Sequence, residues 1–386
     1  MIKNLVNLIY DLFKIFLLNL FGFKIIFLDC SRIGGYYDLF WHKRSSQKKK
    51  FYFILFAPNN KIANIFFHNL IEKDFDVKYK SYNYLIYKIF QKLGLSYHPL
   101  NLVPDNIDKM KRIYANKKNK LYFYQKNLLI ENYNYEYKKI SFINSEYIYD
   151  KYNLKKNNYI SFHSRDKNYL KNIYPDRDWS YHDYRDSDIQ NYADAITKLY
   201  NKTLLKGVRI GKYVSNNLMN SECIFDYSQS NDYFDEGEIS IINNSKIFLC
   251  SDTGATIFSE YINMPKVYVN WSNPLRIHRW SRDSLFIFKK IYSIEKKKYL
   301  KIEEILNINF NDHNFLKYFK LIDNSAEEIM EALHESLLRI EGKWNGTEDD
   351  IKLQNKFWNL FGDYDYSRNK TYIGSSFLRQ NKDILF

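Results

Sequence analysis

The side chains best suited to chemistry lie directly after short apolar runs. Residues 159–163 read YISFH, and the polar run continues through Ser164, Arg165 and Asp166. Ionisable groups at the end of a strand carry an energetic cost unless they are used, and the guanidinium of Arg165 suits bidentate binding of a phosphate. The alternative is a surface loop with an Arg–Asp pair. We expect the run from His163 to Asp166 to contribute to an anion site.

A second polar run follows the apolar residues 246–250. It consists of Ser251, Asp252, Thr253 and Gly254, and it opens an expected helix. Small hydroxyl residues and a glycine at a helix N-terminus expose backbone N–H groups, and the helix dipole adds partial positive charge, so an anion binds there readily. An ordinary capped helix start is the alternative.

Two further strand ends carry an arginine and a glycine. Arg32 and Gly34 follow residues 24–28, and Arg209 and Gly211 lie at the end of residues 204–210. The pair Arg209 and Gly211 does not belong to a phosphate-binding P-loop. Such a loop has four residues between two glycines and a serine or threonine after its lysine, whereas Tyr213 follows Lys212 here. Each of the two arginine–glycine pairs predicts a basic group at the end of a strand that could bind an anion. The alternative for each is a tight turn with an arginine on the surface.

His182 is the best candidate for a general acid or base by residue type, because the pKa of a free imidazole is near neutrality. It lies in residues 181–186, just before an expected helix over 187–200 that Asp186 or Ser187 can cap. A hydrogen-bonded loop histidine is the alternative.

No motif indicates a metal ion. The chain has no HExxH and no clustered histidines and cysteines, and its four Asp-x-Asp pairs do not follow good strands. Its three cysteines form no CxxC pair, which argues against a disulfide framework and favours a reducing compartment.

Length and composition indicate a globular protein of about two domains in 386 residues. Aromatic residues make up 18%, which excludes a disordered chain. The net charge of +14 suits an anionic partner, such as a nucleotide, a phospholipid surface or nucleic acid. Genomic composition bias toward lysine and asparagine explains part of the same excess.

The N-terminal residues 5–28 are mainly apolar but interrupted by polar residues at helical spacing. This pattern is typical of a helix that lies in a membrane interface or packs on a domain. A spanning helix is the third alternative.

Short apolar runs alternate with amphipathic stretches along the chain, which predicts an α/β fold with parallel sheets. The expected strands are residues 24–28, 51–57, 159–163, 204–210, 222–226, 246–250 and 266–270. The expected helices are residues 61–72, 83–93, 187–200, 235–244, 254–262 and 325–341. In such folds ligands bind at the carboxyl ends of the strands, where the strand order reverses.

Several of these motifs together resemble a bacterial glycosyltransferase family of surface-polysaccharide loci. The matching segments are residues 28–34, 163–166, 181–186, 209–211, 225–228, 251–254, 323–335 and 373–378. More distantly, the second half is similar to the donor domains of GT-B transferases. The run from His163 resembles the His-x-Arg stretch of fucosyltransferases, and the run from Ser251 resembles the Asp-Thr-Gly of heptosyltransferases.

The resemblance implies two Rossmann-like domains facing a cleft, with an N-terminal amphipathic helix. We expect a helix over residues 1–24, an acceptor domain over 25–155 and a nucleotide-sugar donor domain over 156–386. The donor-binding residues that the resemblance implies are Arg32, Gly34, His163, Arg165, Arg185, Arg209, Gly211, Asp226, Ser251, Asp252, Thr253 and Gly254. His182 and Asp166 are the two candidates for the general base.

The expected function is transfer of a sugar from a nucleotide donor to a surface-glycan or lipid-linked acceptor. The resemblance to GT-B enzymes also implies that no metal and no cofactor besides the donor is needed, and cationic side chains would then stabilise the leaving group. The expected location is cytoplasmic, with residues 1–22 on the inner membrane face. Two alternatives remain, a non-catalytic scaffold of the same fold and a basic nucleic-acid-binding protein, although nucleic acid is not the expected partner.

Overall fold

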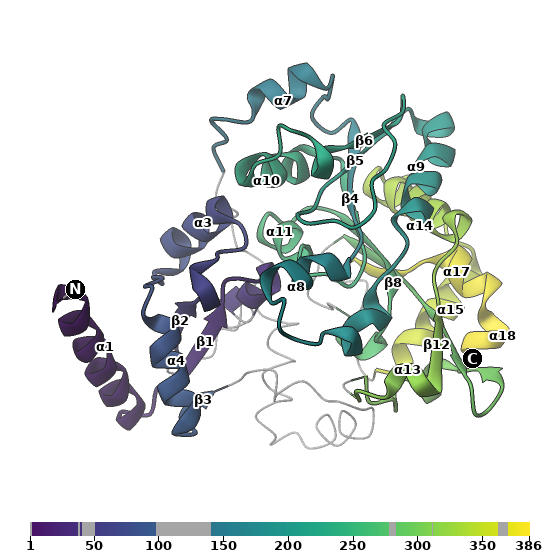
Figure 1. Cartoon of the computed structure of the whole chain (residues 1–386). Coiled ribbons are helices and arrows are strands. Elements are labelled where there is room, and N and C mark those ends of the chain that lie inside the picture. Colours follow the sequence, from purple (N-terminus) through teal and green to yellow (C-terminus); the bar gives the residue numbers. More distant parts are fainter. Residues whose placement is uncertain are drawn as a thin grey trace. The chain divides into compact units, whose positions relative to one another are not determined.

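The chain divides into two compact units, which are described separately here. In the computed structural model the first unit holds the described residues up to Tyr97, and the second holds those from Ile140 onward (Figure 1). The residues that the structure describes are 2–37, 39–40, 51–97, 140–277, 283–310, 312–361 and 370–386.

The first unit is built on a parallel sheet of three strands in the order β2-β1-β3. Its strands are β1 (Lys24–Asp29), β2 (Phe51–Phe56) and β3 (Ser96–Tyr97). Its helices are α1 (Ile2–Leu20), α3 (Ile65–Phe75) and α4 (Asn83–Lys92). The parallel pairing of β1 and β2 confirms the α/β prediction for this half of the chain.

Helix α1 is the N-terminal amphipathic helix that the sequence predicts. Ile15 is buried against Ile25 and Ile54, and the neighbouring leucines of α1 pack beside it. One side of the helix therefore belongs to the core of the first unit. Within the described part of the chain, no helix combines the length and the apolar character needed to cross a bilayer.

The second unit contains a seven-stranded, fully parallel sheet in the order β13-β9-β8-β7-β4-β5-β6. The strands are β4 (Tyr159–His163), β5 (Lys206–Arg209), β6 (Ile224–Asp226), β7 (Ile247–Cys250), β8 (Lys266–Trp271), β9 (Ser284–Phe288) and β13 (Thr371–Ile373). Strands β4 to β9 follow the order of a Rossmann fold, with β4 as the first strand.

Helices cover both faces of this sheet, which explains why β7, β8 and β9 are buried along their whole length. Helices α9 (Ile189–Thr203) and α14 (Ala326–Ile340) pack together on one face, and α10 (Asp235–Asn244) packs with α11 (Thr256–Tyr261) on the other (Figure 1). Two short helices, α7 (Glu146–Lys151) and α8 (Lys167–Ile173), flank β4 in sequence.

The C-terminal part adds a small sheet and a helical tail. Strands β10 (Lys290–Ser293), β11 (Lys298–Tyr299) and β12 (Phe319–Ile322) pair antiparallel in the order β11-β10-β12. The remaining helices are α12 (Ile302–Ile305), α13 (Phe315–Tyr318), α15 (Glu348–Asn359), α17 (Ser375–Gln380) and α18 (Lys382–Leu385).

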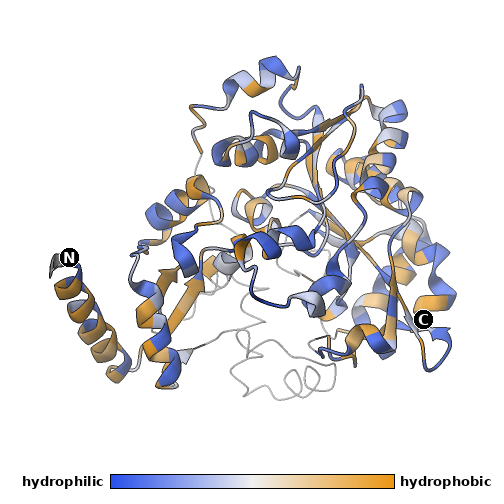
Figure 2. Ribbon diagram, in the orientation of Figure 1, coloured by the Kyte–Doolittle hydropathy of each residue, from blue (hydrophilic) through white to orange (hydrophobic). Residues whose placement is uncertain are grey.

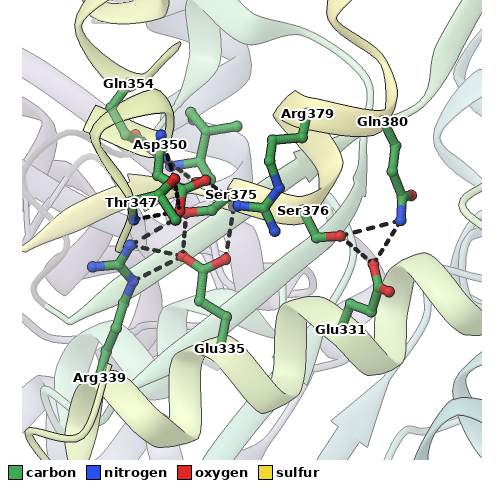
Figure 3. Close-up of polar contacts among 11 residues, drawn as sticks. Glu331, Glu335, Arg339, Thr347, Asp350, Gln354, Ser375, Ser376, Arg379 and Gln380 are labelled. Atoms are coloured by element: carbon green, nitrogen blue, oxygen red, sulfur yellow. Dashed lines mark hydrogen bonds and ion pairs between the residues drawn. The ribbon is translucent and has the colours of Figure 1, made fainter. Parts of the chain in front are cut away.

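Polar contacts hold this tail on α14 (Figure 3). The carboxylate of Glu335 accepts from the backbone N–H of Ser375 at 2.6 Å and from its hydroxyl at 2.9 Å. Arg339 donates to the same carboxylate, and Arg379 pairs with Asp350 at the start of α15. The two tail segments quoted for the family resemblance are thus in direct contact.

The second unit starts earlier than the expected boundary at residue 155. Asn144 donates its backbone and side-chain N–H groups to Glu236 on α10, and Ser145 bonds to Ser240 on the same helix. Residues 140–155 therefore pack with the second sheet. Two strands of that sheet, β9 and β13, are absent from the sequence-based list.

Candidate functional site

The strand order of the large sheet reverses between β4 and β7. Chain order runs outward from β4 through β5 to β6, then returns to β7 on the other side of β4. Such a reversal leaves a crevice at the carboxyl ends of the two central strands, which is where ligands bind in open α/β sheets. Both polar runs singled out from the sequence lie at this position, because one follows β4 and the other follows β7.

The two runs are in direct contact. The backbone N–H of Arg165 donates to the hydroxyl of Ser251 at 2.8 Å, and Ser251 is fully buried. The guanidinium of Arg165 pairs with the carboxylate of Asp186, in the segment before α9. Burial lowers the pKa of Arg165, and the positive charge of Arg185 adds to that effect.

A second arginine joins β7 to the same segment. Arg185 donates through Nε and Nη2 to the carbonyl oxygen of Asp252, at 3.1 and 2.8 Å, and through Nη2 to its carboxylate at 2.8 Å. The other carboxylate oxygen of Asp252 accepts from the hydroxyl of Ser272, which follows β8. Arg165, Arg185 and Asp252 therefore lie together where the strand order reverses between β4 and β7.

Asp186 is the most strongly perturbed carboxyl of this group. Its pKa is raised to about 6, mainly by burial and also by the negative charges of Asp183 and Asp166, against the opposing positive charges of Arg165 and Lys289. The ammonium of Lys289, directly after β9, donates to the backbone carbonyl of Asp186 and pairs with Asp323 at 2.9 Å. Asp186 does not cap α9 as expected; Asp188 does, by accepting from the N–H of Gln190.

His163 ends β4 beside this cluster. Its Nδ1 lies 3.1 Å from the carbonyl oxygen of Ile210, which can only accept, so Nδ1 carries the proton and Nε2 keeps its lone pair. Burial lowers the pKa of His163 to about 4, so the ring is neutral at pH 7. Gly211 has a φ of +137°, and a Cβ there would lie 2.9 Å from Nδ1 of His163. Gly211 is therefore needed for the close approach of the imidazole.

Arg209 lies at the carboxyl end of β5, but its guanidinium is paired with a carboxylate of the same chain. Its side chain is 2% exposed and pairs with Asp226 at 2.9 Å, and Asp226 also accepts from the backbone N–H of Leu218. This buried pair fixes the loop between β5 and β6. These contacts give Arg209 and Asp226 a structural role, and their role in donor binding stays a prediction.

The two base candidates differ in their surroundings. Asp166 caps α8 by accepting from the N–H of Asn168 at 2.7 Å, and its other oxygen accepts from both the N–H and the hydroxyl of Ser215. His182 lies in the short 3-10 helix Ser180–Arg185, half-buried against the rings of Trp179 and Tyr181.

The remaining expected residues divide between the units. Thr253 and Gly254 lie in the turn before α11, where the carbonyl oxygen of Thr253 accepts from the hydroxyl of Thr256. Arg32 and Gly34 belong to the first unit, in the turn after β1 that Asp29 closes by accepting from Ser31. The two sets are not placed relative to each other.

Sequence reasoning did not identify Ser272 and Lys289 as site residues. Each follows a strand of the sheet directly, β8 for Ser272 and β9 for Lys289. The same rule that selected Arg165 would have found Ser272 after the predicted strand 266–270. Lys289 follows a strand that the list lacked. In the described ranges no three histidine, cysteine or acidic side chains gather as a metal site would require.

Comparison with known proteins gives distant structural similarity. No family model and no curated protein matches the chain. Among solved structures, ADP-heptose lipopolysaccharide heptosyltransferase II from E. coli has 10% identity and a TM-score of 0.42, with coverage of 82% of this chain and 99% of that chain. UDP-GlcNAc 2-epimerase from Methanocaldococcus jannaschii has 11% identity and a TM-score of 0.29, with coverage of 83% and 99%. At these values neither similarity decides the activity of this chain.

Proposed function

We propose that this protein is a glycosyltransferase of the GT-B type whose second unit binds a nucleotide-sugar donor. The observation that carries the proposal is the meeting of Arg165, Arg185 and the Ser251–Gly254 turn at the reversal of strand order. A pyrophosphate needs cationic hydrogen-bond donors at one place, and the guanidinium groups of Arg165 and Arg185 lie together there.

In this proposal Arg165 and Arg185 stabilise the charge that develops on the departing nucleoside diphosphate. Neutral His163 offers Nε2 as a hydrogen-bond acceptor to the donor. His182 is the better candidate for the base that deprotonates the acceptor hydroxyl, because Asp166 already accepts three hydrogen bonds. The acceptor is a surface glycan or a lipid-linked sugar, and the reaction takes place in the cytoplasm.

A non-catalytic scaffold of the same fold is the second candidate. It is favoured by one observation: Arg165 and Arg185 are each already paired with a carboxylate, Asp186 and Asp252 respectively. A scaffold keeps such pairs permanently, whereas a transferase exchanges at least one of them for phosphate. The nucleic-acid alternative requires arginines scattered away from the strand ends, and Arg165 and Arg209 lie at strand ends.

The experiment is a calorimetric titration of the full chain with UDP, GDP, ADP, CMP and dTDP. We expect one nucleotide to bind, and Arg165→Ala to weaken that binding by about tenfold to a hundredfold, as for loss of a charged hydrogen bond. Arg177→Ala is the matched control, because Arg177 is exposed and packs over the ring of Tyr174.

Each result decides between the candidates. Binding that falls in Arg165→Ala and not in Arg177→Ala supports the transferase. Equal affinity in both variants removes Arg165 from the donor site. Absence of binding for all five nucleotides favours the scaffold.

A further inference from the structure

Helix α1 carries a second apolar side that the first unit does not bury. Six residues form what we call the apolar stripe: Leu5, Val6, Ile9, Phe13, Phe16 and Leu20. Their side chains are 44–67% exposed. At 100° per residue they fall within an arc of about 100°, so they form one continuous line along the helix. Figure 2 shows hydrophobic residues along the length of α1.

The stripe is separate from the side that packs on the unit. Leu8, Leu12, Ile15 and Leu18 contact the core cluster around Ile54, and none of them belongs to the stripe. The core of the first unit is therefore formed without the side chains of the stripe. Large exposed apolar surfaces of this kind mark sites of interaction with a protein or a membrane.

Charge in this part of the chain favours an anionic partner. Residues 1–97 contain fifteen lysines and arginines against six aspartates and glutamates, so a quarter of the chain holds a net +9 of the total +14. The acidic residue of α1, Asp11, forms an ion pair with the ammonium of Lys80 at 2.6 Å and accepts a hydrogen bond from the hydroxyl of Tyr82 at 2.5 Å. No uncompensated negative charge on α1 opposes an anionic surface.

We propose that the apolar stripe of α1 docks on a lipid bilayer that contains anionic headgroups. Phe13, Phe16 and the aliphatic residues enter the boundary between headgroups and acyl chains, while the lysines of the first unit meet the anionic lipids. The helix lies in the plane of the interface and does not cross it. This inference is independent of the donor site in the second unit.

The test is co-sedimentation of the full chain with vesicles of phosphatidylcholine and phosphatidylglycerol, about three to one. The variant Ile9→Ser/Phe13→Ser/Leu20→Ser removes apolar side chains that the fold does not need. We expect its partition onto the vesicles to fall by at least about tenfold, since each side chain loses its burial in the bilayer. Added salt, or vesicles of phosphatidylcholine alone, should also weaken binding of the unaltered chain.

The control variant is Leu85→Ser/Leu93→Ser, which changes an exposed apolar residue of α4 and the exposed leucine that directly follows this helix in the same unit. It should sediment like the unaltered chain. Equal sedimentation of the stripe variant and the unaltered chain, or no vesicle binding at all, overturns the proposal. A third outcome is also possible: the unaltered chain is a dimer in light scattering, the stripe variant is a monomer, and neither binds vesicles. That result would overturn the proposal and assign the stripe to contact between copies of the chain. The nucleotide affinity of the unaltered chain and of the two variants is measured as well, because it reports on the donor site independently of vesicle binding.

Discussion

At the scale of single residues, Asp186 decides how available Arg165 is to a ligand. The carboxylate pairs with the guanidinium of Arg165, and in our proposal a diphosphate must compete with that carboxylate. The charged groups that face Asp186 are Arg165, Lys289, Asp183 and Asp166. Because its pKa is raised to about 6, Asp186 is charged at pH 8 and mostly protonated at pH 5.

Asp186→Asn should therefore strengthen nucleotide-diphosphate binding at pH 8 by about tenfold and change it little at pH 5. The ratio of the two affinities isolates Asp186, because titration of the ligand phosphate affects both proteins equally. His163 does not contribute in this range, since burial holds its pKa at about 4. Calorimetry at several pH values measures the ratio, and a constant ratio between pH 5 and 8 would refute this competition.

The sequence predicts where these residues lie better than what they contact. Arg165 and Ser251 were located because a strand end dictates their position in a parallel sheet. Arg209 satisfies the same rule, yet it pairs with Asp226 in a buried contact. Which carboxylate an arginine meets depends on loops that only the folded chain brings together.

At the scale of elements, helix α14 shows that some features depend on neighbouring residues and others on residues far along the chain. Ser325 caps α14, and Glu328 three residues later completes the capping box. The contact of Glu335 with Ser375 spans 40 residues of sequence. Burial raises the pKa of Glu335, and Arg339 and Ser375 oppose the shift.

Glu335→Ala should lower the free energy of unfolding by about 2–4 kcal/mol, because two donors of Ser375 and the guanidinium of Arg339 lose their acceptor. Thermal denaturation measures the loss. Glu331→Ala is the control: it bonds to Ser376 and Gln380 (Figure 3), of which Gln380 is exposed and Ser376 half-buried, and we expect a change below about 1 kcal/mol. Equal losses in the two variants would contradict the assigned role of Glu335.

Strands and helices with clear periodicity were predicted closely. The bounds of β4 and α10 are those expected, and β7 differs by one residue. Helix α3 begins at Ile65, four residues late, because Asn64 provides the cap. The strand β13 has three residues and pairs with β9 from far along the chain, and neither its length nor its partner gives a local pattern.

At the scale of the whole molecule, the chain combines two α/β units, each with its own parallel sheet and with a different role in our account. The second unit holds the candidate donor site at the reversal of its strand order. The first carries the apolar stripe and most of the net positive charge. The alternation of strands and helices predicts this class of fold, because short buried strands separated by amphipathic helices have few other arrangements.

Hydrogen–deuterium exchange of the full chain, with and without the nucleotide that binds, tests the site most directly. The account predicts slower exchange in peptides that cover residues 163–168 and 251–256, where Arg165 and the Ser251–Gly254 turn meet. Protection confined to other segments, or no change in these two, would contradict it.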